Sequence, residues 1–400
     1  MRDFLTMLSL FGSSATGNAQ QIDNDINVDA VLSCAHKQGV WTVIYPNLKT
    51  VSGAEKYHLQ FLKVVSDSIK RNEFTLNVLN KISDMGIRVC ILKGVFTASL
   101  YVNPDYRISS DTDILIDSKE ENKVAKLLCN FGYKVEKRKR NEHHMKAIHP
   151  IGGLLEVHIS MYSKITSEVI FAGYDMYNEE WIPFNIGDKQ FYTLGVNDNL
   201  NYLTAHFLKH FIQGEASIRQ IMDLLLYINK YKTEIDFDKY NKLLKELNYY
   251  KLICAVRSIG SKYFGVEFKQ CCEEDMNLLL NDLFQCGIFG VSSLDNPNIY
   301  NIFCKRRSPV SKIKLDYMLL FDSEYSVFSK FFPNSDALVK RGYTYAKKKI
   351  LVPVAWVNRF WDLVLKKERK VVYKGINYYL LKEREYMMDK LGVFDGGVKT

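Results

Sequence analysis

Residues 107–117, with the sequence RISSDTDILID, place two aspartates at the start of a strongly apolar run. Residues two apart on a β-strand share a face, so Asp111 and Asp113 point one way while Ile114 and Ile116 point the other. Burying unpaired carboxylates is costly, and the partner that best fits an acid-x-acid pair is a cation. This stretch therefore predicts a buried strand with a cation site at its mouth.

The residues on either side predict a compact α/β unit. RVCILKG, residues 88–94, indicates a short strand that ends at a glycine, and residues 95–102 follow as a short helix. Residues 118–133 predict a second helix with a capping box from Ser118 to Glu121. Three more strand candidates follow, at residues 133–139, 144–150 and 154–162.

Helical periodicity dominates both ends of the chain. Apolar residues at spacings of three and four run through residues 1–87. Two amphipathic helices are predicted at residues 197–214, with a capping Asn or Asp at its start, and at residues 217–231. We therefore expect an α+β fold, in which a small mixed-sheet core at residues 88–190 lies between helical regions at residues 1–87 and 191–400.

The formal net charge of +9 is concentrated in the last hundred residues, which hold 21 Lys and Arg against 10 Asp and Glu. Such a segment is compatible with nucleic acid, a membrane surface or an acidic partner. Its basic residues alternate with apolar ones, which favours helices with one buried and one solvated face over a continuous basic groove. The apolar positions include Ile313, Leu315, Leu320, Val354, Val357 and Leu363. Within residues 347–370 we also expect Trp356 and Trp361 to be buried, with joints at residues 292–298 and 305–311.

Cysteine usage and the N-terminus indicate a reduced, cytoplasmic protein. The eight cysteines show no CxxC spacing, and adjacent Cys271 and Cys272 are poorly placed to pair with each other. Asp3 and the interrupted apolar run after it favour a first helix over a signal peptide. We expect no membrane span, because no run of about 18 apolar residues occurs in the sequence.

A third acid is expected to join the aspartate pair. In LLEVHIS, residues 154–160, Glu156 and His158 share one strand face. If this strand lies beside the aspartate strand, the carboxylates of Asp111, Asp113 and Glu156 converge. Three hard oxygen ligands suit Mg²⁺ (or Mn²⁺) that also binds substrate phosphates. The chemistry that needs this arrangement is phosphoryl or nucleotidyl transfer. The alternative is a strand end in which the aspartates accept hydrogen bonds from turn amides.

The turn at Lys93-Gly94 is the expected phosphate site. A glycine between a strand and a helix lets a phosphate approach the backbone, and a helix N-terminus favours an anion. Lys93 is placed to contact a triphosphate. The turn lies 17 residues before the aspartate pair, in a strand–helix–strand context.

ILKGVFTASLYVNPDYRISSDTDILID, residues 91–117, resembles the nucleotidyltransferase superfamily typified by DNA polymerase β and the antibiotic nucleotidyltransferases. Gly94, Asp111, Asp113 and Glu156 match the glycine turn, the acid pair and the later acid of that family. The chain is still more similar to an uncharacterised bacterial nucleotidyltransferase family, over about residues 85–230. It departs from the superfamily pattern at the turn, where Lys93-Gly94 stands in place of Gly-Gly or Gly-Ser.

The resemblance implies a nucleotidyltransferase core at residues 88–190 and a magnesium-dependent transfer of NMP from an NTP, with ATP expected. An acceptor hydroxyl, amine or phosphate would attack the α-phosphate and release pyrophosphate. Asp111 and Asp113 would hold the metal ions, and Glu156 would hold the catalytic one and help to deprotonate the acceptor. We favour a small molecule or glycan precursor over nucleic acid as acceptor. The alternative function is a catalytically inactive nucleotide-binding or interaction scaffold.

Four helical residues are further candidates. His206 and His210 have the spacing of zinc ligands, but Phe207 stands where HExxH proteins carry the catalytic glutamate, so we do not expect zinc there. Arg219 and Asp223 have the spacing of an ordinary helical ion pair. The family resemblance instead places all four residues at the catalytic cleft, where they would bind the nucleotide.

Two positions near the strands remain. Arg107 is expected either to pair with Asp111 or to touch the nucleotide. The segment EHHMKAIHP, residues 142–150, carries three histidines, His143, His144 and His149, for which we expect a solvated strand edge rather than a metal site.

Overall fold

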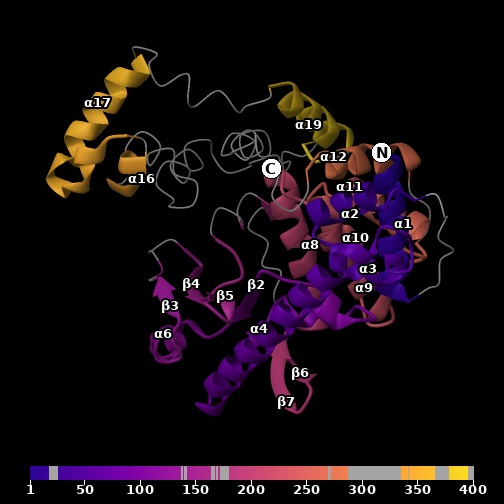
Figure 1. Ribbon diagram of the computed structural model, residues 1–400, viewed down its shortest axis with the longest axis horizontal. Coiled ribbons are helices and arrows are strands. Elements are labelled where there is room, and N and C mark those ends of the chain that lie inside the picture. Colours follow the sequence, from indigo (N-terminus) through magenta and orange to yellow (C-terminus); the bar gives the residue numbers. More distant parts are fainter. Residues whose placement is uncertain are drawn as a thin grey trace.

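The computed structural model describes residues 1–17, 26–136, 138, 142–163, 167, 170–171, 180–268, 272–286, 335–340, 342–364 and 378–394. Within these ranges the protein combines one mixed β-sheet with many helices, which confirms the expected α+β fold (Figure 1). Both expected joints, at residues 292–298 and 305–311, lie outside the described residues, as do Ile313, Leu315 and Leu320.

In the described ranges the sheet has seven strands in the order β3-β4-β5-β2-β1-β7-β6. The strands are β1 (Cys90–Ile91), β2 (Asp111–Leu115), β3 (Lys134–Glu136), β4 (His144–His149), β5 (Gly153–His158), β6 (Ile182–Ile186) and β7 (Lys189–Thr193). β2 runs parallel to β5, and β1 runs antiparallel to β2 and parallel to β7. The expected strand pairing around the acid pair therefore occurs, in a sheet of mixed direction.

The hairpin of β6 and β7 is an element that the sequence analysis missed. Gly187, with φ at +61°, forms its turn, and β7 pairs with β1, about 100 residues earlier in the chain. The buried ring of Phe191 anchors β7 in the core. The sheet thus continues to Thr193, so the boundary expected at residue 190 falls inside a strand.

Helix starts differ from the sequence prediction in two places. Asp117, not Ser118, caps the 3-10 turn η3 (Ser118–Glu120), because its carboxylate accepts a hydrogen bond from the Lys119 amide, and α6 (Glu121–Asn130) follows. The short helix after Gly94 is α5 (Val95–Ala98), only four residues long. A single turn has little dipole of its own, and the anion site at its N-terminus stays a prediction.

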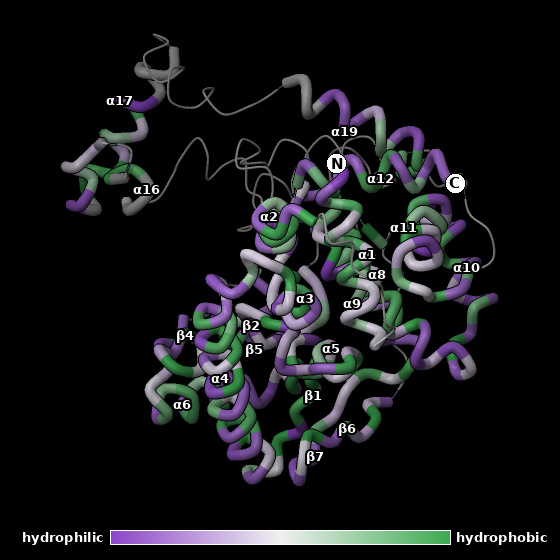
Figure 2. The backbone as a smooth tube through the Cα atoms, turned by 45° about the vertical axis from the view of Figure 1, so that its right-hand side comes forward, coloured by the Kyte–Doolittle hydropathy of each residue, from purple (hydrophilic) through white to green (hydrophobic). Residues whose placement is uncertain are grey.

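The N-terminal helices are α1 (Arg2–Thr16), α2 (Val28–Gln38), α3 (Trp41–Leu48) and α4 (His58–Asp84), joined by the 3-10 turn η1 (Glu55–Tyr57). A second 3-10 turn, η2 (Pro104–Tyr106), leads into β2. Hydrophilic and hydrophobic residues alternate along the long helix α4, which is typical of a helix with one packed face (Figure 2). This helix contacts α6, β7 and η2, and so supports the sheet from one side.

The helices after the sheet are α8 (Val196–Gln213), α9 (Ile218–Lys230), α10 (Phe237–Glu246), α11 (Tyr250–Tyr263) and α12 (Glu273–Gln285). The expected capping Asn or Asp of the first is wrong, because α8 starts after Gly195 and Asp198 lies buried in its first turn. α9 begins with a capping box between Ser217 and Gln220.

One hydrophobic core joins the sheet to the helices before and after it. The Gln38 side chain in α2 donates to the Leu283 carbonyl at 2.7 Å and accepts from the Ile218 amide at 2.9 Å. A Cβ atom on Gly12 would lie 2.2 Å from the Tyr263 carbonyl oxygen, so α1 and α11 approach too closely for any larger residue. The N-terminal helices α1 and α2 therefore pack directly against α9, α11 and the end of α12.

The last described helices are α16 (Ser335–Lys340), α17 (Val352–Val364) and α19 (Tyr378–Lys390), with 3-10 turns η4 (Thr344–Lys347) and η5 (Lys349–Leu351). The expectation that Trp361 is buried is wrong, since 55% of it is exposed, and Val354 and Val357 are exposed as well. The packed face of α17 carries Ala355 and the partly buried Trp356 instead. Leu363 lies in α17, but its side chain falls outside the description. None of the described helices combines the length and apolarity needed to cross a bilayer.

Candidate active site

Two neighbouring parallel strands bring the predicted carboxylates together. In the register of β2 and β5, Asp113 lies directly opposite Glu156, and Asp111 precedes Asp113 by two residues on the same strand face. Only 2% of Asp113 is exposed, whereas Asp111 and Glu156 are half-buried. Ligand atoms of Asp113, Glu156 and His158 lie within 4.8 Å of one another. The structure therefore brings Asp113 and Glu156 together, and Asp111 lies on the same strand face but outside this closest group.

Lys93 lies between the two aspartates. Its Nζ atom is 2.9 Å from Asp111 Oδ2 and 3.1 Å from Asp113 Oδ2. Burial alone would lower the pKa of Lys93, but the Asp113 and Asp111 carboxylates outweigh it and raise the pKa, so the ammonium stays charged. Lys93 was expected to contact a triphosphate, and in the structure its charge balances the acid pair.

The acids differ in their affinity for protons. Burial tends to raise the pKa of Asp113, but Lys93 and the hydrogen bond with His158 outweigh it and hold the pKa well below its usual value. For Glu156, burial and then the negative charge of Asp113 raise the pKa. Neighbouring carboxyl groups whose pKa values are shifted in opposite directions are typical of sites where one acid stays ionised and the other exchanges a proton.

The donor set fits Mg²⁺. All three carboxylates offer hard oxygen atoms, which Mg²⁺ prefers over nitrogen or sulfur. Among the described residues, Asp113 Oδ2 is a buried oxygen without a hydrogen bond of good geometry, although Lys93 lies close to it. A buried carboxylate oxygen in this state is stabilised by a cation.

The conformation of Gly94 allows Lys93 to lie beside the two aspartates. Its φ and ψ of +76° and −110° belong to a region that only glycine adopts without strain. A Cβ atom there would lie 3.4 Å from the Asp111 carbonyl oxygen, so the turn packs directly on the start of β2. The glycine therefore positions Lys93 at the end of β1, over the aspartates.

Comparison with known families identifies the chain. Residues 24–265, more than half of its length, match a protein family described as uncharacterised nucleotidyltransferase. The chain belongs to this family. The matched segment runs from just before α2 to the end of α11 and includes every strand of the described sheet. All three carboxylates therefore lie in the part that makes this protein a nucleotidyltransferase.

Other comparisons are weaker. Among solved structures, the chain is similar to an antigenic nucleotidyltransferase-like protein from Paracoccidioides brasiliensis. The TM-score is 0.28 and the identity 15%, over 53% of this chain and 96% of that chain. No curated protein sequence matches the chain.

Most of the residues that were predicted to bind the nucleotide line a small cavity. Its volume is about 30 Å³, which is enough for a water molecule. Five of the seven predicted nucleotide-binding residues line it, together with Asp111: Lys93, Arg107, His206, Arg219 and Asp223. A larger cavity, about 510 Å³, lies at the opposite end of β2 and β5, beside Leu115 and Asp117. Its lining in the described residues holds none of the three carboxylates, whereas Asp111 lines the smaller cavity.

Arg107 and Asp223 form a buried ion pair. Two guanidinium nitrogens of Arg107 donate to the two carboxylate oxygens at 2.8 and 2.5 Å, and the Tyr101 hydroxyl donates to the same carboxylate at 2.8 Å. The alternative that paired Arg107 with Asp111 is therefore wrong, as is the default pairing of Arg219 with Asp223. The pair instead ties the loop before β2 to α9.

Arg219 and His206 also line this cavity. Arg219 donates to the Ile108 carbonyl at 2.8 Å, while its Nε has no hydrogen-bond partner among the described residues. His206 faces the cavity, and its ring packs against that of His210 at 4.6 Å. His210 in turn lies 3.4 Å from Glu215. Burial lowers the pKa of His206 well below its usual value, so this ring is neutral.

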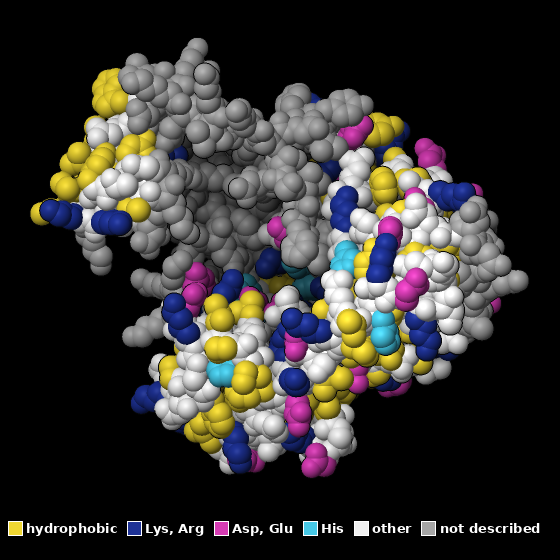
Figure 3. All heavy atoms as spheres, in the orientation of Figure 1, with side chains coloured by type: hydrophobic (Ala, Val, Ile, Leu, Met, Phe, Trp, Pro, Cys, Tyr) yellow, Lys and Arg dark blue, Asp and Glu magenta, His cyan; other side chains and the backbone are white. Residues whose placement is uncertain are grey.

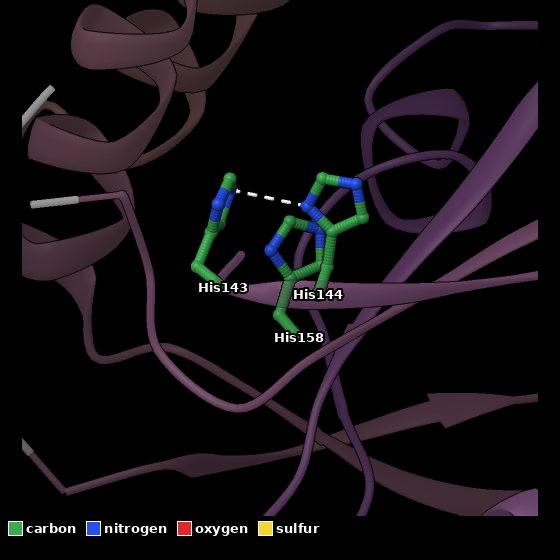
Figure 4. A group of neighbouring side chains, drawn as sticks. All are labelled: His143, His144 and His158. Atoms are coloured by element: carbon green, nitrogen blue, oxygen red, sulfur yellow. Dashed lines mark hydrogen bonds between the residues drawn. The ribbon is translucent and has the colours of Figure 1, made fainter. Parts of the chain in front are cut away.

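The expectation of a solvated edge for His143 and His144 is wrong. β4 is an interior strand between β3 and β5, and only 6% of His143 is exposed. Both rings point toward His158 beside the carboxylates (Figure 4). Burial lowers the pKa of His143 to about 2 and of His144 to about 3. The E-x-H pattern of β5 predicted that His158 lies on the same face as Glu156. The approach of the β4 histidines to His158 depends on the order of the strands, which the sequence does not reveal.

The space-filling view shows histidine side chains in a hollow between the sheet and α8 (Figure 3).

Proposed function

We propose that this protein transfers a nucleoside monophosphate from an NTP, with ATP preferred, to an acceptor hydroxyl, amine or phosphate. Pyrophosphate is the second product, and Mg²⁺ (or Mn²⁺) at Asp111, Asp113 and Glu156 is required. A small molecule or glycan precursor is the favoured acceptor. One observation carries the proposal: Asp113 and Glu156 are paired across parallel strands, with Asp111 on the same face and a charged lysine between the aspartates.

The side chains have separate tasks in this proposal. Bound Mg²⁺ supplies charge neutralisation for the triphosphate and lowers the pKa of the attacking group. Glu156, whose pKa is raised by burial and by Asp113, accepts the acceptor's proton. With Mg²⁺ held by Asp111 and Asp113, the Lys93 ammonium would be available to pair with a phosphate oxygen. Arg219 lines the cavity, and its Nε has no hydrogen-bond partner in the described part of the chain, so it offers a second cation to the triphosphate.

The Lys93 contacts also favour a second candidate function. An ammonium that permanently neutralises both aspartates would make the protein a nucleotide-binding or interaction scaffold without catalytic turnover. In that case Mg²⁺ would not change the affinity for NTP, because the carboxylates would already have their cation.

The double substitution Asp111→Asn, Asp113→Asn tests the site. We expect it to abolish Mg²⁺-dependent NTP binding in calorimetric titrations while far-UV circular dichroism stays unchanged, because the amides keep the shape but lose the charge that binds the metal. Asp117→Asn is the matched control, since Asp117 is an exposed residue just past the other end of the same strand. Unchanged Mg²⁺-dependent affinity in the double variant would refute the carboxylate site.

A further inference from the structure

Three histidines form a cluster beside the carboxylates. His144 begins β4 and lies opposite His158, the last residue of β5, in the register of the two strands. His143 lies in a bend just before β4, so the alternation of strand faces does not separate its ring from that of His144. The ring centroids are 4.5 Å apart for His143 and His144, and 5.2 and 5.1 Å from His158 respectively. Figure 4 shows all three rings pointing toward one another.

The spacing of the nitrogen atoms suits a tetrahedral ion. Zinc–nitrogen bonds of about 2.1 Å in tetrahedral geometry hold neighbouring nitrogen ligands about 3.4 Å apart. His144 Nδ1 and His143 Nε2 are 3.3 Å apart. One nitrogen from each of the three rings lies within 4.8 Å of the others, so a modest side-chain rotation of His158 completes the set.

The outward-facing nitrogens of two rings lie near carboxylates. His158 Nε2 is 3.0 Å from Asp113 Oδ1, and His144 Nε2 is 3.8 Å from Glu156 Oε1. Metal-binding histidines usually donate their second N–H group to a carboxylate, which fixes the tautomer and the ring orientation. An Nε2–H group on His158 that donates to Asp113 leaves its Nδ1 as the free lone pair for a metal ion.

A purely hydrogen-bonded cluster does not explain this arrangement. His143 and His144 can share one proton between Nε2 and Nδ1, but His158 is only 4% exposed and its Nδ1 has no hydrogen-bond partner among the described residues. A buried nitrogen without a partner is costly unless another ligand satisfies it. A metal ion bound by all three rings would do so.

We propose that His143, His144 and His158 form a second metal site, for a first-row divalent ion of the type that prefers imidazole, with Zn²⁺ as its best representative. The site is distinct from the oxygen-only magnesium site and adjoins it through the contact of His158 with Asp113. Three protein ligands leave a fourth position for water or for an acceptor group, as in catalytic zinc sites. Bound metal would also hold His158, and through it Asp113, in one orientation.

Metal stoichiometry of the full chain tests the proposal. After chelator treatment and dialysis, the protein is equilibrated with Zn²⁺ in millimolar Mg²⁺ without nucleotide, and bound zinc is measured by elemental analysis. We expect one zinc per chain at low micromolar free Zn²⁺. His143→Asn combined with His144→Asn should weaken zinc binding by about 100-fold or more, because two of three ligands are lost. The control is His36→Asn with His58→Asn, which removes two histidines from the N-terminal helices.

Two further measurements make the result decisive. Asp111→Asn should keep the full zinc stoichiometry, so failure of the magnesium site leaves this proposal standing. If the double histidine variant does not fold, Co²⁺ bound to the wild-type chain gives the answer instead, because four-coordinate Co²⁺ absorbs visible light far more strongly than six-coordinate Co²⁺. A stoichiometry well below one, equal zinc binding in the histidine and control variants, or a weak six-coordinate Co²⁺ spectrum would each overturn the proposal.

Discussion

At the scale of single residues, Lys93 has contacts that differ from those expected of it, because it was predicted to contact a triphosphate. Its ammonium contacts both aspartates, which otherwise would repel each other in a buried site. The acid pair itself was predictable from the sequence, because the period-two pattern of a strand places Asp111 and Asp113 on one face. The partner of the pair was not, since a lysine at the end of another strand reaches them only through the fold.

Lys93→Met should lower the free energy of unfolding of the metal-free protein by about 3–5 kcal/mol, the usual effect of removing one partner of a buried ion pair. Mg²⁺ should then raise the melting temperature more in the variant than in the wild type, since the ion replaces the lost positive charge. Thermal unfolding with and without Mg²⁺ checks this, with Lys93→Arg as the charge-conserving control. An equal effect of Mg²⁺ on wild type and Lys93→Met would contradict competition between lysine and metal.

The buried pair of Arg107 and Asp223 gives a second prediction at this scale. Arg107→Met should destabilise the protein by about 3–5 kcal/mol, because it leaves the Asp223 carboxylate buried with a hydrogen bond only from Tyr101. Adding Asp223→Leu should recover part of the loss, since both charges of the pair are then removed together. Denaturant unfolding of the single and double variants measures both effects.

The matched control is Lys56→Ala, which breaks an exposed ion pair with Asp29 and should leave the unfolding midpoint almost unchanged. A double variant no more stable than Arg107→Met would show that the charge pair is not the source of the effect. The sequence analysis missed this pairing because it joins residues 116 positions apart.

At the scale of elements, the strands around the acids were predictable and the sheet's other half was not. Short apolar runs with clear alternation predict the strands β1, β2 and β5. The positions of the acids predict that β2 and β5 are neighbours in the sheet. The β6–β7 hairpin joins the sheet by pairing β7 with β1, a long-range contact that no local pattern indicates. Helix ends were less certain for a similar reason, because Asp117 and Ser118 are both good capping residues and only the fold selects one.

Gly94→Ala tests the turn between β1 and α5. We expect a loss of about 1–3 kcal/mol in stability from backbone strain, together with weaker Mg²⁺-dependent NTP binding, because Lys93 and the start of β2 shift together. Gly53→Ala is the control: Gly53 also has a positive φ, at +86°, but nothing lies within 4 Å of a Cβ atom there. Nucleotide titrations measure the NTP affinity of both variants, and unfolding curves measure their stability. Equal NTP affinity in the two variants would show that the turn does not position the site.

At the scale of the whole molecule, the helical regions and the sheet act as one packed unit. Gln38 in α2 bonds to the Leu283 carbonyl, 245 positions away, and the Arg384 side chain of α19 donates to Asp282 of α12. These contacts join helices before and after the sheet in one hydrophobic core, while α16, η4 and α17 hold a separate small cluster. The sequence pattern gave the helices but not their packing, because amphipathic faces do not specify their partners.

If the three carboxylates catalyse NMP transfer, the protein must release pyrophosphate from an NTP. The full chain is incubated with Mg²⁺, each of the four NTPs and the small-molecule fraction of a cell extract as acceptor source. We predict pyrophosphate release that depends on NTP and Mg²⁺, is highest with ATP, and falls by at least about 100-fold in Glu156→Gln, while NTP affinity stays within a few-fold. Asp117→Asn should release pyrophosphate at the wild-type rate. Mg²⁺-dependent NTP binding without release from any NTP, or equal release by wild type and Glu156→Gln, would contradict the account.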